Sequence, residues 1–244
     1  MEEHDNLAEK IREILGGAPG KMKVLEQQID MDLQVEYYEC SQKMRAELEE
    51  KEALDKARYL AEPGYSPQVK REILARLASI ERVECFRSIE AFLKNGEEEL
   101  RDWTHLALNE SRMLLESTLL DESQVFISTG LGGRDQKLRY FVVLVSKGDL
   151  ALDDTQKKVI GNEFETILSC YNAEVEEIRF SEFMAAILIL LPMQFAMSPV
   201  FREAIRECNY YGDFLENDFI VTNVKKMTFP EIKDFLKDKR NKSG

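Results

Sequence analysis

The sequence contains one long uninterrupted apolar run, FMAAILILL at residues 183 to 191, and Pro192 ends it. A run this short, without polar alternation, is typical of a strand that is covered on both faces. The β-branched residues Ile187 and Ile189 favour a strand over a buried helical turn. The run is also too short to span a bilayer, which needs about 20 residues. We therefore expect this segment to lie at the middle of a β-sheet.

The segments around this run predict an α+β domain over residues 124 to 238. The expected elements are, in chain order, strand 139–145, helix 153–171, strand 175–180, the central strand, helix 198–211 and strand 219–224. This is the βαββαβ order of a ferredoxin-like layer. One extra strand, at 125 to 129, precedes the layer. It lies either at an edge of the sheet or in a hairpin with 139 to 145.

Residues 1 to 121 show helical periodicity and predict an all-helical domain. A short amphipathic helix is expected at 7 to 15. From 21 to 61 no Gly or Pro interrupts the chain, and apolar residues recur every three or four positions, which predicts one long helix. The apolar stripe of this helix is the candidate interaction site, and it includes Leu25, Ile29, Leu33, Tyr37 and Met44. It packs against helices of its own chain, against a second copy or against a partner protein.

Three shorter helices are expected between residues 67 and 120. Ser66 and Pro67 provide an N-cap followed by proline at the first helical position, and Asn95-Gly96 ends the second helix. Short antiparallel helices joined by small turns resemble a HEAT-like helical repeat over this range. That resemblance implies a binding scaffold, because stacked helix pairs of this kind present interaction surfaces.

The composition restricts partners and compartment. The formal net charge is −13 at neutral pH, and such an acidic surface repels the phosphates of nucleic acids and anionic membranes. The four cysteines form no CxxC pair, which favours reduced, buried thiols. The N-terminus lacks the pattern of a signal peptide, and residues 239 to 244 are expected to be a flexible tail. We therefore expect a cytoplasmic protein that binds neither nucleic acid nor membrane.

The glycine-rich segment at 130 to 135 is the nearest approach to a phosphate-binding loop. Such loops lead into a helix whose N-terminus binds the anion, but this one leads into a predicted strand. It is better interpreted as a hairpin loop. Its candidate contact residues are Gly132, Gly133, Arg134 and Asp135.

No set of residues in the sequence carries recognisable chemistry. Glu98, Asp102 and His105 fall on one helix face, but metal sites in helical proteins take ligands from more than one helix. RNA-recognition domains share the βαββαβ order, yet their aromatic signature and basic charge are missing. We therefore expect no metal and no cofactor.

These features favour a non-catalytic interaction or adaptor protein that binds another protein, or itself as a homo-oligomer, through its helical domain. Two alternatives come from other functional classes. One is a regulatory domain that senses a small ligand, and the other is an enzyme that uses carboxylates or Cys208 in an unfamiliar site.

Overall fold

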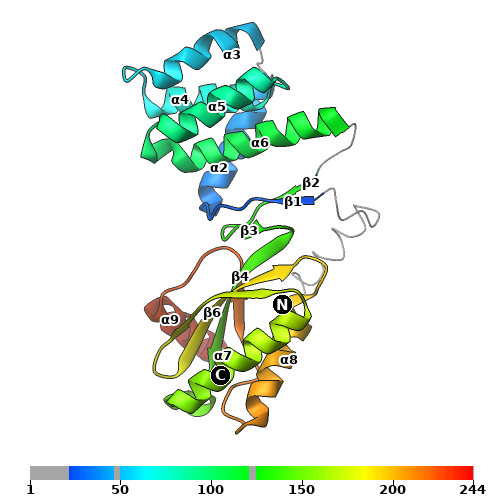
Figure 1. Cartoon of the computed structure of the whole chain (residues 1–244). Coiled ribbons are helices and arrows are strands. Elements are labelled where there is room, and N and C mark those ends of the chain that lie inside the picture. The colour runs from blue at the N-terminus through cyan, green and yellow to red at the C-terminus, as the bar shows by residue number, and fades with distance from the viewer. Residues whose placement is uncertain (1–21, 47–49, 121–124, 244) are drawn as a thin grey trace. The chain divides into compact units, whose positions relative to one another are not determined.

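The computed structural model describes residues 22–46, 50–120 and 125–243, and these residues divide into two compact units. Of the described residues, those between 22 and 128 form the helical unit, and those between 129 and 243 form the α+β unit (Figure 1). The helix expected at 7 to 15 lies outside the described residues. Within the described ranges, no helix is both long and apolar enough to cross a membrane.

An antiparallel sheet organises the α+β unit, with β6 (Met184–Pro192) and β4 (Lys137–Val145) paired along their whole length at its centre. On the outer side of β6 lies β5 (Glu174–Phe180). On the outer side of β4 lie β3 (Gly133–Arg134) and β7 (Ile220–Thr222), which pair with different parts of that strand. The prediction that the apolar run forms a central strand is therefore confirmed.

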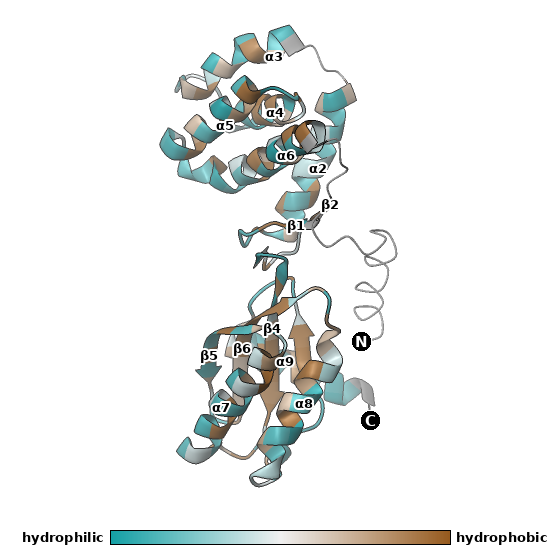
Figure 2. Cartoon of the chain, turned by 45° about the vertical axis from the view of Figure 1, so that its right-hand side comes forward, coloured by the Kyte–Doolittle hydropathy of each residue, from teal (hydrophilic) through white to brown (hydrophobic). Residues whose placement is uncertain are grey.

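Helices cover both faces of this sheet. The helices α7 (Asp154–Cys170) and α8 (Met197–Tyr210) pack side by side on one face, whereas α9 (Phe229–Ser243) packs on the other (Figure 1). Alternate residues of β6 serve the two layers, since Ile187 faces α7 and α8 and Leu188 faces the α9 side. A strand buried on both faces needs apolar residues at every position, which explains the continuous run (Figure 2).

Local signals set the helix starts of this unit. At α7, the Asp153 carboxylate accepts a hydrogen bond from the Gln156 N–H, and the Gln156 side chain accepts one from the Asp153 N–H. This capping box satisfies two backbone donors that have no partner within the helix. The helix therefore begins where the sequence predicts it. A single turn, η4 (Lys147–Asp149), connects β4 to this region.

The helical unit contains the three helices expected after Ser66. In chain order its helices are α2 (Met31–Ala46), α3 (Glu50–Lys56), η2 (Ala57–Ala61), α4 (Pro67–Ala78), α5 (Val83–Asn95), η3 (Glu98–Leu100) and α6 (Arg101–Leu120). The Ser66 hydroxyl accepts a hydrogen bond from the Val69 N–H at 3.4 Å, so it caps α4 as expected.

The prediction of one long helix over 21 to 61 is wrong. The strand β1 (Met22–Val24) pairs in parallel with β2 (Val125–Ile127), and the Asp30 carboxylate accepts from the Asp32 N–H where α2 begins. The extra strand expected at 125 to 129 is therefore neither an edge of the main sheet nor half of a hairpin. It belongs to a separate two-stranded sheet, because its partner is the segment that periodicity assigned to a helix.

The predicted apolar stripe lies in the core of the helical unit. Leu25, Ile29, Tyr37 and Met44 are buried there, and Leu33 is half-buried against the same cluster. The helices α4, α5 and α6 supply the rest of that core, including Leu74, Ile89 and Trp103. The stripe thus stabilises its own unit and forms no open apolar surface.

Candidate nucleic-acid interface

Three long side chains follow one exposed face of α8 in the α+β unit. Arg202, Arg206 and Tyr210 are spaced by four residues, so they line up over about 12 Å of the helix axis. The opposite face of α8 is buried in the core through residues such as Phe201 and Cys208. Burial of that face fixes the exposed row relative to the sheet.

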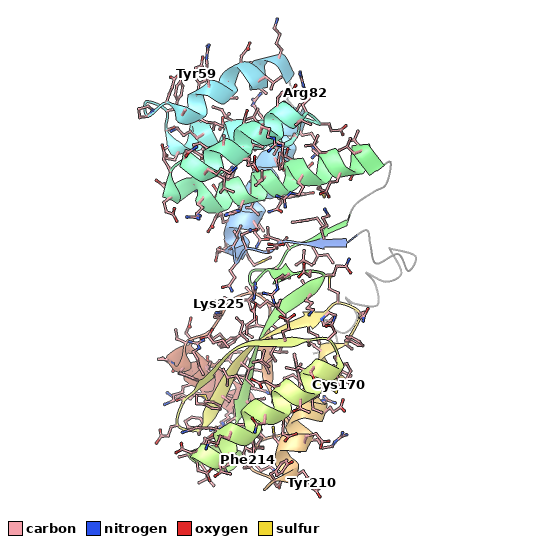
Figure 3. All side chains as sticks on the ribbon, viewed as in Figure 1. Tyr59, Arg82, Cys170, Tyr210, Phe214 and Lys225 are labelled. Carbon is pink, nitrogen blue, oxygen red and sulfur yellow. The ribbon has the colours of Figure 1, made fainter. Side chains whose placement is uncertain are left out.

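The loop after α8, residues 211 to 218, runs beside this row. The buried side chains of Phe214 and Leu215 hold it to the unit. The Asn209 side chain donates to the Leu215 carbonyl at 2.9 Å and accepts from the Leu215 N–H at 2.8 Å. The loop therefore forms a fixed wall beside the helix, and Figure 3 labels Tyr210 and Phe214 at this end of the unit.

Helix and loop together enclose a groove of about 610 Å³. Its lining residues are polar or charged with one exception, and they are Arg202, Ile205, Arg206, Asn209, Tyr210, Asp213, Asn217 and Asp218. Pockets of this volume accommodate small organic ligands, which are typically held in clefts of roughly 300 to 1,000 Å³.

The two carboxylates of the groove are each paired with a lysine. The Lys147 ammonium lies 2.6 Å from an Asp213 oxygen, and the Lys239 ammonium lies 3.8 Å from an Asp218 oxygen. On the helix side, the Arg206 guanidinium contacts its neighbour Glu207 at 3.2 Å. These pairs neutralise most of the negative charge around the groove.

Arg202 is exposed and, within the part of the chain that the structure describes, makes no hydrogen bond or ion pair. Its five N–H donors are therefore available to an anion, and a guanidinium binds phosphate in a bidentate manner. The groove has a cationic helix side although the whole chain carries a charge of −13.

The groove ends at an exposed aromatic pair. The side chains of Tyr210 and Tyr211 are 85% and 62% exposed, far more than the tyrosines of the core. Their ring centroids lie 5.8 Å apart at an interplanar angle of 86°. An exposed ring beside cationic side chains is suited to stacking with a base whose phosphate the cations bind.

The glycine-rich segment expected to be a contact loop forms a tight hairpin between β3 and β4. Asp135 and Gln136 both have positive φ, at 49° and 64°, as a two-residue hairpin turn requires. Of the four candidate residues, Gly132 and Gly133 are buried, and Arg134 and Asp135 are exposed.

Acidic side chains of β5 form ion pairs with the basic side chains of this hairpin. Arg134 and Lys137 both pair with Glu174, and Arg139 pairs with Glu176. The pKa of Glu174 is lowered, first by its hydrogen bond with Lys137. The hairpin residues are therefore engaged within the sheet, whereas Arg202 on α8 pairs with none of the described residues.

The other candidate chemical groups do not form a site. In the described ranges, no group of three His, Cys, Asp or Glu side chains is placed to hold a metal ion. Partial burial lowers the pKa of His105. Cys208 is fully buried in the α8 face that packs on the sheet, and burial raises its thiol pKa to about 12. This environment disfavours the thiolate, which is the nucleophilic form of a cysteine.

The residues of the groove were missed at the level of sequence. The four-residue spacing of Arg202, Arg206 and Tyr210 is visible in the sequence once a helix is assigned there. No sequence signal, however, places Asn217 and Asp218 beside them, because that depends on how the loop returns to the sheet.

No protein-family model matches this chain, and comparison with curated proteins finds no match. Among solved structures, one neighbour is a candidate transposase from Deinococcus radiodurans R1, at 16% identity and a TM-score of 0.36 over 43% of this chain and 93% of that one. Another is a REP-associated tyrosine transposase bound to a REP hairpin, at 12% identity and a TM-score of 0.33 over 43% of this chain and 63% of that one.

These neighbours correct three expectations from the sequence. Neither of them is a HEAT-like repeat protein, and neither is an adaptor, so that resemblance and that function are withdrawn. The expectation of a protein partner without nucleic acid is corrected as well, because one neighbour is bound to a nucleic-acid hairpin. At these TM-scores the likeness supports no statement about activity.

Proposed function

We propose that the α+β unit binds single-stranded nucleic acid in the groove between α8 and residues 211–218. The observation that carries this proposal is the position of Tyr210. Tyr210 is 85% exposed and lines the groove together with the exposed Arg202. A base stacked on Tyr210 would place its phosphate within the range of the arginines on the same helix face.

The remaining groove residues suit the other parts of a nucleotide. Asn217 carries both an amide donor and a carbonyl acceptor, and the carboxylates of Asp213 and Asp218 accept from exocyclic amino groups or sugar hydroxyls. Arg202 and Arg206 lie on the α8 side of the groove, so a bound nucleotide is oriented with its phosphate toward that helix.

The groove favours a single strand over a duplex. Stacking on an exposed ring requires an unstacked base, which a duplex does not offer. Tight duplex binding depends on many cations that follow the phosphate backbone, and in this chain 46 acidic residues outnumber 33 Lys and Arg residues and oppose such binding.

Fluorescence anisotropy with a labelled oligothymidine of about 12 nucleotides tests the proposal on the full chain. Wild type should bind this strand more tightly than the corresponding duplex. Tyr210→Ala should weaken binding by about 1 to 3 kcal/mol, or about 5- to 150-fold, which is the usual cost of losing one stacked base. The variant with both Arg202→Ala and Arg206→Ala should flatten the plot of log affinity against log salt by about 1.4, because each phosphate contact on a single strand contributes about 0.7.

Matched controls come from the helical unit. Tyr38 is 64% exposed and the Arg87 side chain is 69% exposed, so Tyr38→Ala and Arg87→Ala remove comparable surface groups. Both control variants should bind like wild type. Failure of wild type to bind, or equal losses in the control and groove variants, would refute the proposal.

We also infer that the α+β unit is a ferredoxin-like domain and that the helical unit is a separate domain. The chain order β4, α7, β5, β6, α8, β7 supports this inference. The antiparallel neighbours β7, β4, β6 and β5 support it as well, because their order has the first and third strands at the centre.

A further inference from the structure

A second pocket of about 270 Å³ lies in the α+β unit, beside β7 and α9. Val145, Phe219 and Leu236 contribute apolar surface to it. Its charged lining residues are Glu216, Asp218, Lys239 and Arg240. It thus combines apolar surface with two cations and two carboxylates, and the turn residues of the β3–β4 hairpin do not line it.

This pocket shares a lining residue with the groove beside α8. Asp218 lines both of them, and the Lys239 ammonium that pairs with Asp218 lines the second pocket. The backbone around Asp218 is fixed on one side by the Glu216 N–H, which donates to the Val145 carbonyl at 2.9 Å. The groove and the second pocket therefore meet at Asp218.

The cations at this pocket are positioned by the fold. The Arg240 guanidinium donates two hydrogen bonds to the Asp149 carboxylate, at 2.7 and 2.8 Å, and these bonds lower the pKa of Asp149. This bidentate pair holds the C-terminal part of α9 beside the pocket. Lys239 projects from the same helical turn, with its side chain 55% exposed.

We propose that this second pocket binds the base next to the one stacked on Tyr210, with Lys239 at the phosphate between them. This rests on the proposed function and extends it to a site for at least two nucleotides of one strand. The apolar surface of Val145, Phe219 and Leu236 suits the faces of an unstacked base, and the adjacent cations suit the backbone.

A length series of ligands tests this inference on the full chain. The probes are thymidine 5′-monophosphate and the 5′-phosphorylated thymidine dinucleotide, each measured by competition against a labelled oligothymidine. Wild type should bind the dinucleotide about 5- to 150-fold more tightly than the mononucleotide, the usual gain from one further stacked base. Lys239→Ala should remove most of this gain, and the readout is the ratio of dinucleotide to mononucleotide affinity within each variant. Lys237→Ala is the matched control, because Lys237 is exposed on the same helix and lines neither pocket.

The outcomes separate this inference from the proposed function. Mononucleotide binding that depends on Tyr210, without a gain for the dinucleotide, overturns the second pocket and leaves the groove intact. A dinucleotide gain that survives Lys239→Ala, or that is lost equally in Lys237→Ala, also overturns it. If neither ligand binds, the proposed function fails and the second pocket fails with it.

Discussion

Glu110 is the centre of a buried hydrogen-bond network in the helical unit, and its replacement gives the most direct test of the structure there. Its carboxylate accepts from the Tyr37 hydroxyl at 2.6 Å, from the Ser41 hydroxyl at 2.8 Å and from the Arg45 guanidinium at 2.8 Å. The Glu110 side chain is only 12% exposed. One residue of α6 thus satisfies three donors of α2.

Glu110→Ala removes the acceptor and leaves the buried hydroxyls of Tyr37 and Ser41 without a partner. Each buried unsatisfied donor costs about 1 to 3 kcal/mol, so the helical unit should lose about 2 to 6 kcal/mol of stability. Glu110→Gln keeps one carbonyl acceptor and should lose less. Glu98→Ala is the control, because the Glu98 side chain is 82% exposed and its ion pair with Arg101 contributes little.

Trp103 provides the assay. It is the one tryptophan of the chain and contacts Tyr37 edge to face at a centroid distance of 5.1 Å, so its fluorescence reports on the helical unit. At a urea dependence of about 2 kcal/mol per molar, Glu110→Ala should lower the midpoint by about 1 to 3 M. A midpoint equal to that of wild type or of Glu98→Ala would refute the reasoning.

The same network gives the helical unit a dependence on alkaline pH. Burial, and then the charge of Glu110, raise the pKa of Tyr37 well above its usual value. A raised pKa in the folded state means that the stabilisation is complete below the unfolded value, about 10, and is lost as pH rises through the folded value. The free energy of unfolding followed by Trp103 should therefore fall above pH 10, with Tyr37 contributing up to about 1.4 kcal/mol per pH unit, and Tyr37→Phe should remove this part of the slope.

Two further predictions concern the α+β unit and the thiols. Ile187→Asp places an unpaired carboxylate in a fully buried strand, at a cost of several kcal/mol against a stability of about 5 to 15, so it should unfold this unit while the Trp103 transition persists. A far-UV circular dichroism melt equal to that of wild type would contradict this. The exposed Cys170 should react with Ellman's reagent in the native protein, and the buried Cys85 and Cys208 only after unfolding. In the Cys170→Ser variant, rapid labelling of Cys208 in the native protein would contradict this prediction, because it would show that reagent reaches the core beneath α8.

Local signals in the sequence determined much of the α+β unit. The apolar run of β6 is continuous because α7 and α8 cover one face of the strand and α9 covers the other. The start of α7 follows from Asp153 and Gln156, and the start of α4 follows from Ser66 and Pro67. Each of these signals acts within four residues, so it is legible without knowledge of the rest of the chain.

The segment from 21 to 61 shows where such signals are insufficient. Its apolar spacing suits a helix, yet Met22–Val24 forms a strand because Val125–Ile127 provides a partner about 100 residues away. Sequence periodicity records which residues become buried, and the residues Leu25 and Ile29 are indeed buried. It does not record the backbone conformation when a distant strand supplies the hydrogen bonds.

The candidate site, too, was only partly determined by local sequence signals. The sequence by itself determined the row of Arg202, Arg206 and Tyr210, since a helix places residues four apart on one face. Only the tertiary structure decided that Asp218 faces this row and that Lys239 lies next to it. Asp218 comes from a loop and Lys239 from the last helix, and the two residues meet because the buried Leu215 and the Arg240–Asp149 pair hold both segments to the same unit.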